Sequence, residues 1–132
     1  MSPEPDEIDP EVVALATRLF DLARRGVAAD LAAYLDAGVP VDLRNQSGDS
    51  LLMLAAYHGH ADAVAAIAAH GADVNLANDR GQSPLAGAVF KGHDDVVATL
   101  LEAGADPHAG TPTAHDTAVM FGRDDYLALW NR

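Results

Sequence analysis

The sequence predicts an all-α solenoid in which short helix–turn–helix units stack side by side and send out projecting loops. The first observation is a period: glycines recur every 33 residues, which is typical of repeat proteins. The second is composition, since 49% of the 132 residues are hydrophobic but only 5% are aromatic. Much of the apolar content is alanine, the best helix former, and runs of β-branched or aromatic residues that would favour strands are scarce. The recurring glycines are Gly26, Gly59 and Gly92 in one series and Gly38, Gly71 and Gly104 in the other.

The chain opens with an acidic, proline-rich segment that leads into a first edge unit. Residues 1–10 contain three prolines and four acidic residues, and we interpret this composition as a mobile acidic tail. The edge unit covers residues 12–38. We expect its first helix to run from about Glu11 to Arg24, which is longer than the other helices, and its second helix to bury Leu31 and Leu35.

Each internal unit carries the signals of two consecutive helices. In residues 81–104, Ser83 is a favourable N-cap, and Pro84 follows at the first helical position, where its missing N–H is not needed. Gly92 ends this helix. The acidic pair Asp94–Asp95 then opens the second helix, where negative charge suits the helix dipole. The sequence therefore predicts a helix, a tight turn, a second helix and a loop.

Two further segments follow the same plan. Residues 48–71 reproduce it closely, whereas residues 111–132 form a second edge unit. The turn glycine of this last unit, Gly122, comes three residues early, which indicates a shorter connecting loop. Leu127 and Trp130 fall at the positions that are apolar in the preceding unit, and we expect them to face the core.

Short runs of residues recur at fixed places in the internal units. The runs are Gly81-Gln82-Ser83-Pro84-Leu85, Gly92-His93, Val96-Val97, Leu100-Leu101, Gly71-Ala72-Asp73-Val74-Asn75 and Gly104-Ala105-Asp106. Together they resemble the ankyrin repeat, and the resemblance covers the chain beyond the tail. Leu51 departs from the family pattern because it stands where a proline is usual, and Met53 and Ala86 stand where a histidine is usual.

The resemblance implies an L-shaped cross-section, with loops at right angles to the helix pairs and a concave face formed by the loops and the first helices. Terminal repeats must cover the core, because a single repeat cannot bury its apolar face. We therefore expect an ankyrin-repeat domain with a capping repeat at 11–44, internal repeats at 45–77 and 78–110, and a capping repeat at 111–132.

Charge and cysteine content narrow the function classes. The net charge of -12 and the pI of about 4.5 disfavour binding to nucleic acid or to anionic lipid, since both repel an acidic surface. The absence of cysteine excludes disulfides and thiolate chemistry. No signal peptide and no run long enough to cross a membrane is evident. We expect a cytoplasmic protein, and the alanine-rich, cysteine-free composition favours a bacterial source.

Several polar residues could suggest catalysis or metal binding, but structural roles account for them better. His60 and His93 share one repeat position after the turn glycine, and the family resemblance implies that they satisfy backbone groups there. The pairs Asp94–Asp95 and Asp124–Asp125 suit helix starts, and Ser50, Ser83 and Thr113 occupy cap positions. The other histidines are His58, His70, His108 and His115. We therefore expect no enzyme activity, no cofactor and no metal.

The residues at the ends of the first helices form the main candidate binding surface. Two adjacent ladders are predicted to cross the concave face and to bind a partner protein. The first ladder consists of Arg24, Tyr57, Phe90 and Met120, and the second of Arg25, His58, Lys91 and Phe121. Aromatic residues, methionine and arginine are enriched where proteins dock. A groove with an aromatic centre and a basic edge would favour a segment with an apolar anchor and acidic flanks.

Other interpretations of this surface remain open. The ladder residues could simply cover the helix ends, with Tyr57 and Phe90 packed on each other, or the acidic tail could bind the groove. The loop tips provide a secondary set of polar candidates. The favoured interpretation of these residues is that they only form turns. These are Arg44, Gln46, Asp49, Asp79, Arg80, Gln82 and Pro112.

The sequence thus predicts a non-catalytic module that binds an unidentified protein partner through its concave face. The alternative is a structural unit that self-associates as a homodimer through the exposed aromatic residues. A monomer is favoured over the homodimer, and neither nucleic acid nor a membrane is an expected partner.

Overall fold

The computed structural model describes residues 9–131, and these residues contain eight α-helices and no strand. The only ladder-type pairings in this range are the isolated bridges Arg44 with Ser50 and Gly110 with Thr113. The prediction of an all-α solenoid is confirmed. The helices are α1 (Pro10–Arg25), α2 (Ala28–Asp36), α3 (Leu51–Tyr57), α4 (Ala61–Ala69), α5 (Pro84–Lys91), α6 (Asp94–Glu102), α7 (Ala114–Met120) and α8 (Asp124–Trp130).

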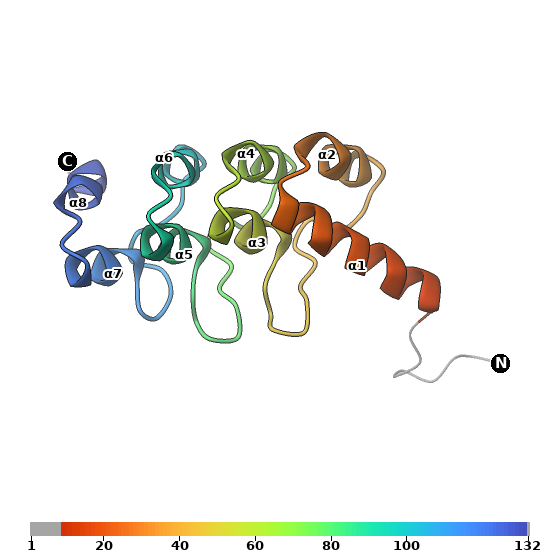
Figure 1. Cartoon of the computed structure of the whole chain (residues 1–132), viewed down its shortest axis with the longest axis horizontal. Helices are drawn as coiled ribbons and strands as arrows, with labels where there is room; N and C mark the ends of the chain where they lie inside the picture. Colours follow the sequence, from red (N-terminus) through yellow and green to blue (C-terminus); the bar gives the residue numbers. More distant parts are fainter. Residues whose placement is uncertain (1–8, 132) are drawn as a thin grey trace.

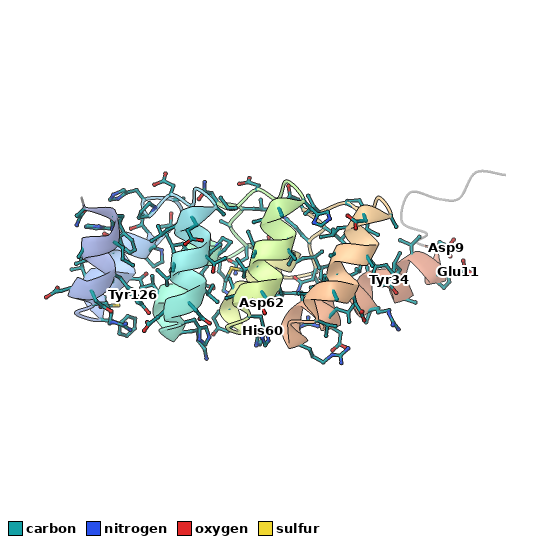
Figure 2. The ribbon with its side chains drawn as sticks, turned by 90° about the horizontal axis from the view of Figure 1, so that it is seen from above. Asp9, Glu11, Tyr34, His60, Asp62 and Tyr126 are labelled. Carbon is teal, nitrogen blue, oxygen red and sulfur yellow. The ribbon has the colours of Figure 1, made fainter. Side chains whose placement is uncertain are left out.

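The helices lie in two rows, and long loops project from one side (Figure 1). Helices α1, α3, α5 and α7 form the inner row, and each packs against the next. Helices α2, α4, α6 and α8 form the outer row, which Figure 2 shows from above. The loops 37–50, 70–83 and 103–113 extend past the inner row, away from the outer one. The inner helices and the projecting loops therefore form the two sides of an open angle.

Side-chain caps start three of the inner helices where the sequence predicts them. The hydroxyl of Ser50 accepts a hydrogen bond from the backbone N–H of Met53 at 3.0 Å, and that of Ser83 accepts one from Ala86 at 3.1 Å. Thr113 does the same for α7, at 2.9 Å. Each cap satisfies a backbone donor that the first turn of a helix would otherwise leave unpaired.

The first helix is the longest, as predicted, and starts one residue earlier than expected, at Pro10. Asp9 caps it by accepting a hydrogen bond from the backbone N–H of Glu11 (Figure 2). Only its second half is buried, through residues such as Leu19 and Leu22. The predicted acidic tail falls mainly on residues 1–8, which lie outside the described part of the chain.

Small residues let neighbouring inner helices approach closely. Ala55 and Ala88 are fully buried between the rows. At Gly87, in the middle of α5, an added Cβ would lie 2.8 Å from the terminal methyl group of Met53 on α3. Such dense packing is typical of protein interiors, where volume changes of one methyl group matter. The alanine-rich composition therefore matches the short spacing of the helices.

The last repeat packs on the core through the predicted residues and through one that was not predicted. Leu127 and Trp130 are half-buried and pack against the core, as expected, while Tyr126 is the buried residue of α8, at 2% exposure. The indole N–H of Trp130 donates to Nδ1 of His115 at 3.1 Å. The comparison of this unit with the preceding one placed its apolar positions correctly, but it missed that the large, hydrogen-bonding side chain of Tyr126 is the buried residue of α8.

Candidate functional site

Two histidines tie the end of one inner helix to the next repeat. Nε2 of His60 lies 2.7 Å from the carbonyl oxygen of Arg24, and Nε2 of His93 lies 3.0 Å from that of Tyr57. Because a carbonyl only accepts, each imidazole donates through a protonated Nε2. Figure 2 shows His60 at the edge of the solenoid where α4 begins. The structural role expected for these histidines is confirmed, and they fix the backbone that carries the candidate ladders.

In the last repeat an arginine replaces this histidine. Arg123 follows Gly122, and its guanidinium contacts Asp94 at 3.2 Å and Asp125 at 2.9 Å. The same group lies 3.9 Å above the ring centroid of Tyr126, whose hydroxyl donates to Asp94. This cluster joins the start of α8 to the start of α6, and sequence reasoning did not find it.

Hydrogen bonds and burial shift the pKa values of the ionisable groups in this cluster. Bonds from Tyr126 and Arg123 lower the pKa of Asp94, and Arg123 lowers the pKa of Asp125. Burial, followed by the bond to Asp94, raises the pKa of Tyr126 to about 12. The two carboxylates stay ionised and serve the helix starts, which agrees with the structural interpretation of the acidic pairs.

The remaining histidines do not converge on one point. His70 contacts the carbonyl oxygen of Ala66 and a carboxylate oxygen of Asp36, both at 2.7 Å. The rings of His108 and His115 contact each other with centroids 4.9 Å apart and planes tilted by 33°. Within residues 9–131, no three His, Cys, Asp or Glu side chains are arranged to hold a metal ion.

Three hollows lie between the inner helices and the loops, and they share lining residues. The α1 hollow, of about 600 Å³, and the central hollow have Arg24, Asn45 and Ser47 in common. The central hollow shares Arg80 and Gln82 with the third, the α5–α7 hollow. The three hollows therefore adjoin one another in a row, which we call the groove. Its remaining lining residues are Val12, Val13, Ala16, Thr17, Phe20, Arg44, Gln46, Asp49, Met53, Leu54, Tyr57, His58, Ala86, Phe90, Thr111, Pro112 and Thr117.

Half of the predicted ladder residues line the groove. Arg24 lies between the α1 and central hollows, Tyr57 and His58 line the central hollow, and Phe90 lines the α5–α7 hollow. Phe90 is 52% exposed. Burial lowers the pKa of His58 below 6.5, and nearby basic groups, first among them His60, lower it further. This perturbation reflects burial first and the neighbouring basic groups second.

The other four ladder residues do not line the groove. Arg25 forms an ion pair with Asp21 at 2.9 Å, and Met120 is 71% exposed. Phe121 and Lys91 lie next to lining residues: the ring of Phe121 packs edge-on against Phe90, and the amine of Lys91 lies 5.2 Å from the ring centroid of Tyr57. The open interpretation had Tyr57 and Phe90 packed on each other; the aromatic pairs in the structure are Phe90 with Phe121 and Tyr57 with His58.

Of the loop-tip residues, expected as a secondary set, all but Asp79 line the groove. Arg44 and Gln46 line the α1 hollow, and Asp49 lines the central hollow. Arg80 and Gln82 line both the central hollow and the α5–α7 hollow. Asp79 lies 4.0 Å from Arg44, and Pro112 lines the α5–α7 hollow. Asp49 and Gln82 are half-buried rather than exposed.

Two asparagines that sequence reasoning missed shape these loops. The side-chain oxygen of Asn45 accepts from the backbone N–H of Ser47 and Asp49, at 2.9 and 3.0 Å. Asn78 repeats this pattern one period later, and its amide also donates to Asp49 at 2.9 Å. Their 33-residue separation was the signal that could have found them. Such asparagine turns hold the loop tips in place without regular strands.

The arrangement of charge in the groove differs from the expected aromatic centre and basic edge. Arg24 and Arg80 flank the central hollow, and in the described part of the chain neither forms an ion pair. The aromatic contribution of Phe90 lies toward one end, between α5 and α7. The central hollow thus combines Arg24 and Arg80 with the ring of Tyr57 and the carboxylate of Asp49, and its two arginines stand out on a chain whose net charge is -12.

The stacked helix pairs and the groove along their loops define a repeat-solenoid protein with an elongated binding face. The model of the family described as ankyrin repeats (3 copies) matches residues 19–111. The chain belongs to the ankyrin-repeat family. Ankyrin repeats are generally protein–protein interaction modules and are typically non-catalytic.

Two relatives share part of the chain. An ankyrin repeat protein of Pseudomonas aeruginosa, PA3287, is 56% identical over 63 residues, which are 48% of this chain and 36% of that protein. The human ankyrin repeat domain-containing protein 29 is 51% identical over 51 residues, which are 38% of this chain and 17% of that protein. The chain therefore matches well under half of either relative. No helix in residues 9–131 combines the length and the apolar character needed to cross a membrane.

Proposed function

We propose that this chain is a non-catalytic module that binds a segment of a partner protein in the groove, using repeats at 11–44, 45–77, 78–110 and 111–132. The observation that carries the proposal is the row of three adjoining hollows along the inner helices and loops. In the same proposal the chain acts as a cytoplasmic monomer and binds neither nucleic acid nor membranes, in keeping with its acidic charge.

The exposed residues in the groove support this proposal. Phe90 exposes half of its surface, and Arg24 and Arg80 are exposed without an ion pair within residues 9–131. Aromatic and arginine side chains contribute most when a partner desolvates them at the centre of an interface. A partner that covers these side chains would give them a role beyond the helix-end contacts of Arg24 and Phe90.

Affinity capture with matched variants tests the proposal. The wild-type chain is immobilised beside Phe90→Ala and Met120→Ala, which remove exposed apolar side chains inside and outside the groove. We expect a captured protein to be lost with Phe90→Ala and kept with Met120→Ala, as identified by mass spectrometry. Equal capture by all three forms would contradict binding in the groove.

Self-association is the second candidate, favoured by the apolar surface at the end of α7. Met120 is 71% exposed, and Phe121 and Val119 also expose half or more of their surfaces. Sedimentation velocity over a range of concentrations decides between the two. A dimer that dissociates in the double variant Met120→Ala, Phe121→Ala would favour the homodimer, whereas a monomer at high concentration would exclude it.

A further inference from the structure

The chemistry of the groove changes along its length. The α5–α7 hollow is lined mainly by apolar surface, with Phe90, Ala86 and Pro112. The α1 hollow is apolar along the helix, where Val12 and Val13 are 57% and 46% exposed. Between them, the central hollow is mainly polar and is bounded by Arg24 and Arg80.

We infer that the groove binds an extended protein segment that has an acidic centre between two apolar side chains. The inference rests on the proposed function and adds the chemistry of the partner. The apolar side chains enter the α1 and α5–α7 hollows, and carboxylates of the segment contact Arg24 and Arg80. A guanidinium can bind a carboxylate through two parallel hydrogen bonds, which favours arginine at such a position.

The geometry of the inner row sets the spacing of the two apolar side chains. Packed helices lie about 8–10 Å apart, and the two apolar hollows are separated by about two and a half such steps, from α1 to the space between α5 and α7. The hollows are therefore roughly 20–25 Å apart. An extended chain advances about 3.3 Å per residue, so the two apolar side chains should stand about six to eight residues apart.

Charge distribution favours a short acidic segment over a nucleic acid. A nucleic acid carries charge along its whole length and would meet the acidic surface around the groove, since the chain has 20 acidic and 8 basic residues. A segment with a few central carboxylates places its charge in the central hollow, where two arginines outnumber the one carboxylate, Asp49, which already accepts a hydrogen bond from Asn78 at 2.9 Å. Its apolar side chains supply affinity that does not depend on charge.

Synthetic peptides test the inference directly on the full chain. The probe is a fluorescein-labelled ten-residue peptide with two leucines seven positions apart and four glutamates between them. One control peptide carries glutamines in place of the glutamates, and a second carries the leucines three positions apart. Binding is measured by fluorescence anisotropy, and random peptides displayed on phage are selected against the same protein in parallel.

Matched protein variants assign the contacts. We expect Arg80→Ala and Arg24→Ala each to weaken binding of the glutamate probe about tenfold, as loss of a charge-assisted contact does. Arg25→Ala is the control because it removes the neighbouring arginine, which pairs with Asp21 outside the groove; it should change the affinity by less than about twofold. Phe90→Ala should weaken the glutamate and glutamine probes equally.

The outcomes separate the inference from the proposed function. Binding of the glutamate probe at least about tenfold tighter than the glutamine probe, and dependent on Arg80, supports the inference. Selected peptides that need Phe90 but have neutral or basic centres would overturn the acidic centre and leave groove binding in place. A single-stranded oligonucleotide that displaces the probe more strongly than the unlabelled peptide would also overturn it. Failure to obtain any peptide weakened by Phe90→Ala would overturn both.

Discussion

Replacing Gly59 by alanine measures how strongly the turn histidines couple neighbouring repeats. Gly59 and Gly71 have φ values of +83° and +87°, so an alanine at either position adopts a left-handed conformation that costs about 1–2 kcal/mol. At Gly59 the new Cβ would also lie 2.9 Å from Cε1 of His93, whereas at Gly71 it meets nothing within 4 Å. His93 must then move and lose its hydrogen bond to the carbonyl of Tyr57, at a further cost of about 1 kcal/mol.

We therefore expect Gly59→Ala to lower the free energy of unfolding by about 2–3 kcal/mol, and Gly71→Ala by about 1–2 kcal/mol. Urea unfolding followed by far-ultraviolet circular dichroism measures both. With a slope of about 2 kcal/mol/M, the difference shifts the midpoint by about 0.5 M. In a His93→Ala background the two replacements should cost the same. Equal losses in the wild-type background, or a difference that persists without the imidazole, would refute the role assigned to His93.

Three further predictions follow from burial, hydrogen bonding and protonation. Leu100→Ala, at a fully buried position, should lower the free energy of unfolding in urea by about 2–5 kcal/mol. Phe90→Ala should leave the unfolding midpoint nearly unchanged, because the side chain of Phe90 is half-exposed. A large loss of stability in Phe90→Ala would show that Phe90 is a core residue. Tyr126→Phe removes the hydroxyl that donates to Asp94 and should lower the unfolding free energy by about 1 kcal/mol, which an unchanged midpoint would contradict. Hydrogen bonds to the carbonyl of Ala66 and then to the carboxylate of Asp36 raise the pKa of His70 above 6.5. The stabilising contribution of His70 is therefore complete below pH 6.5 and is lost as the pH rises through the raised pKa. Urea midpoints measured across this pH range should fall more for the wild type than for His70→Gln, and parallel curves would contradict this.

The period and the helix caps could be predicted because they depend on local sequence. Ser50, Ser83 and Thr113 cap helices through backbone groups three residues away, so the sequence alone identifies them. The Arg123 cluster could not be predicted in the same way. Its partner Asp94 lies in the preceding repeat, and an arginine at the histidine position has no contact that the repeat pattern specifies.

The groove was predicted only in part because of the rotation between neighbouring helical positions. Consecutive residues of an α-helix point about 100° apart, so two adjacent ladders cannot both face the loops along a regular helix. Arg24 and Phe90 face the groove, whereas Arg25 and Lys91, one position later, do not line it. The pattern fails at two positions: His58 lines the groove because it already lies beyond the end of α3, and Met120 does not line it although it belongs to the same ladder as Arg24 and Phe90.

Fold and recognition are carried by different residues of the same repeat. His93 holds the carbonyl of Tyr57 through the backbone, so the position of the groove is fixed whatever side chain the Tyr57 position carries. Arg24, Arg80 and Phe90 contribute little to the buried core and can change without altering the stack. The family's fold therefore leaves the partner unspecified, and the order of apolar, basic and apolar surface along the groove is the feature by which this chain would select one segment over another.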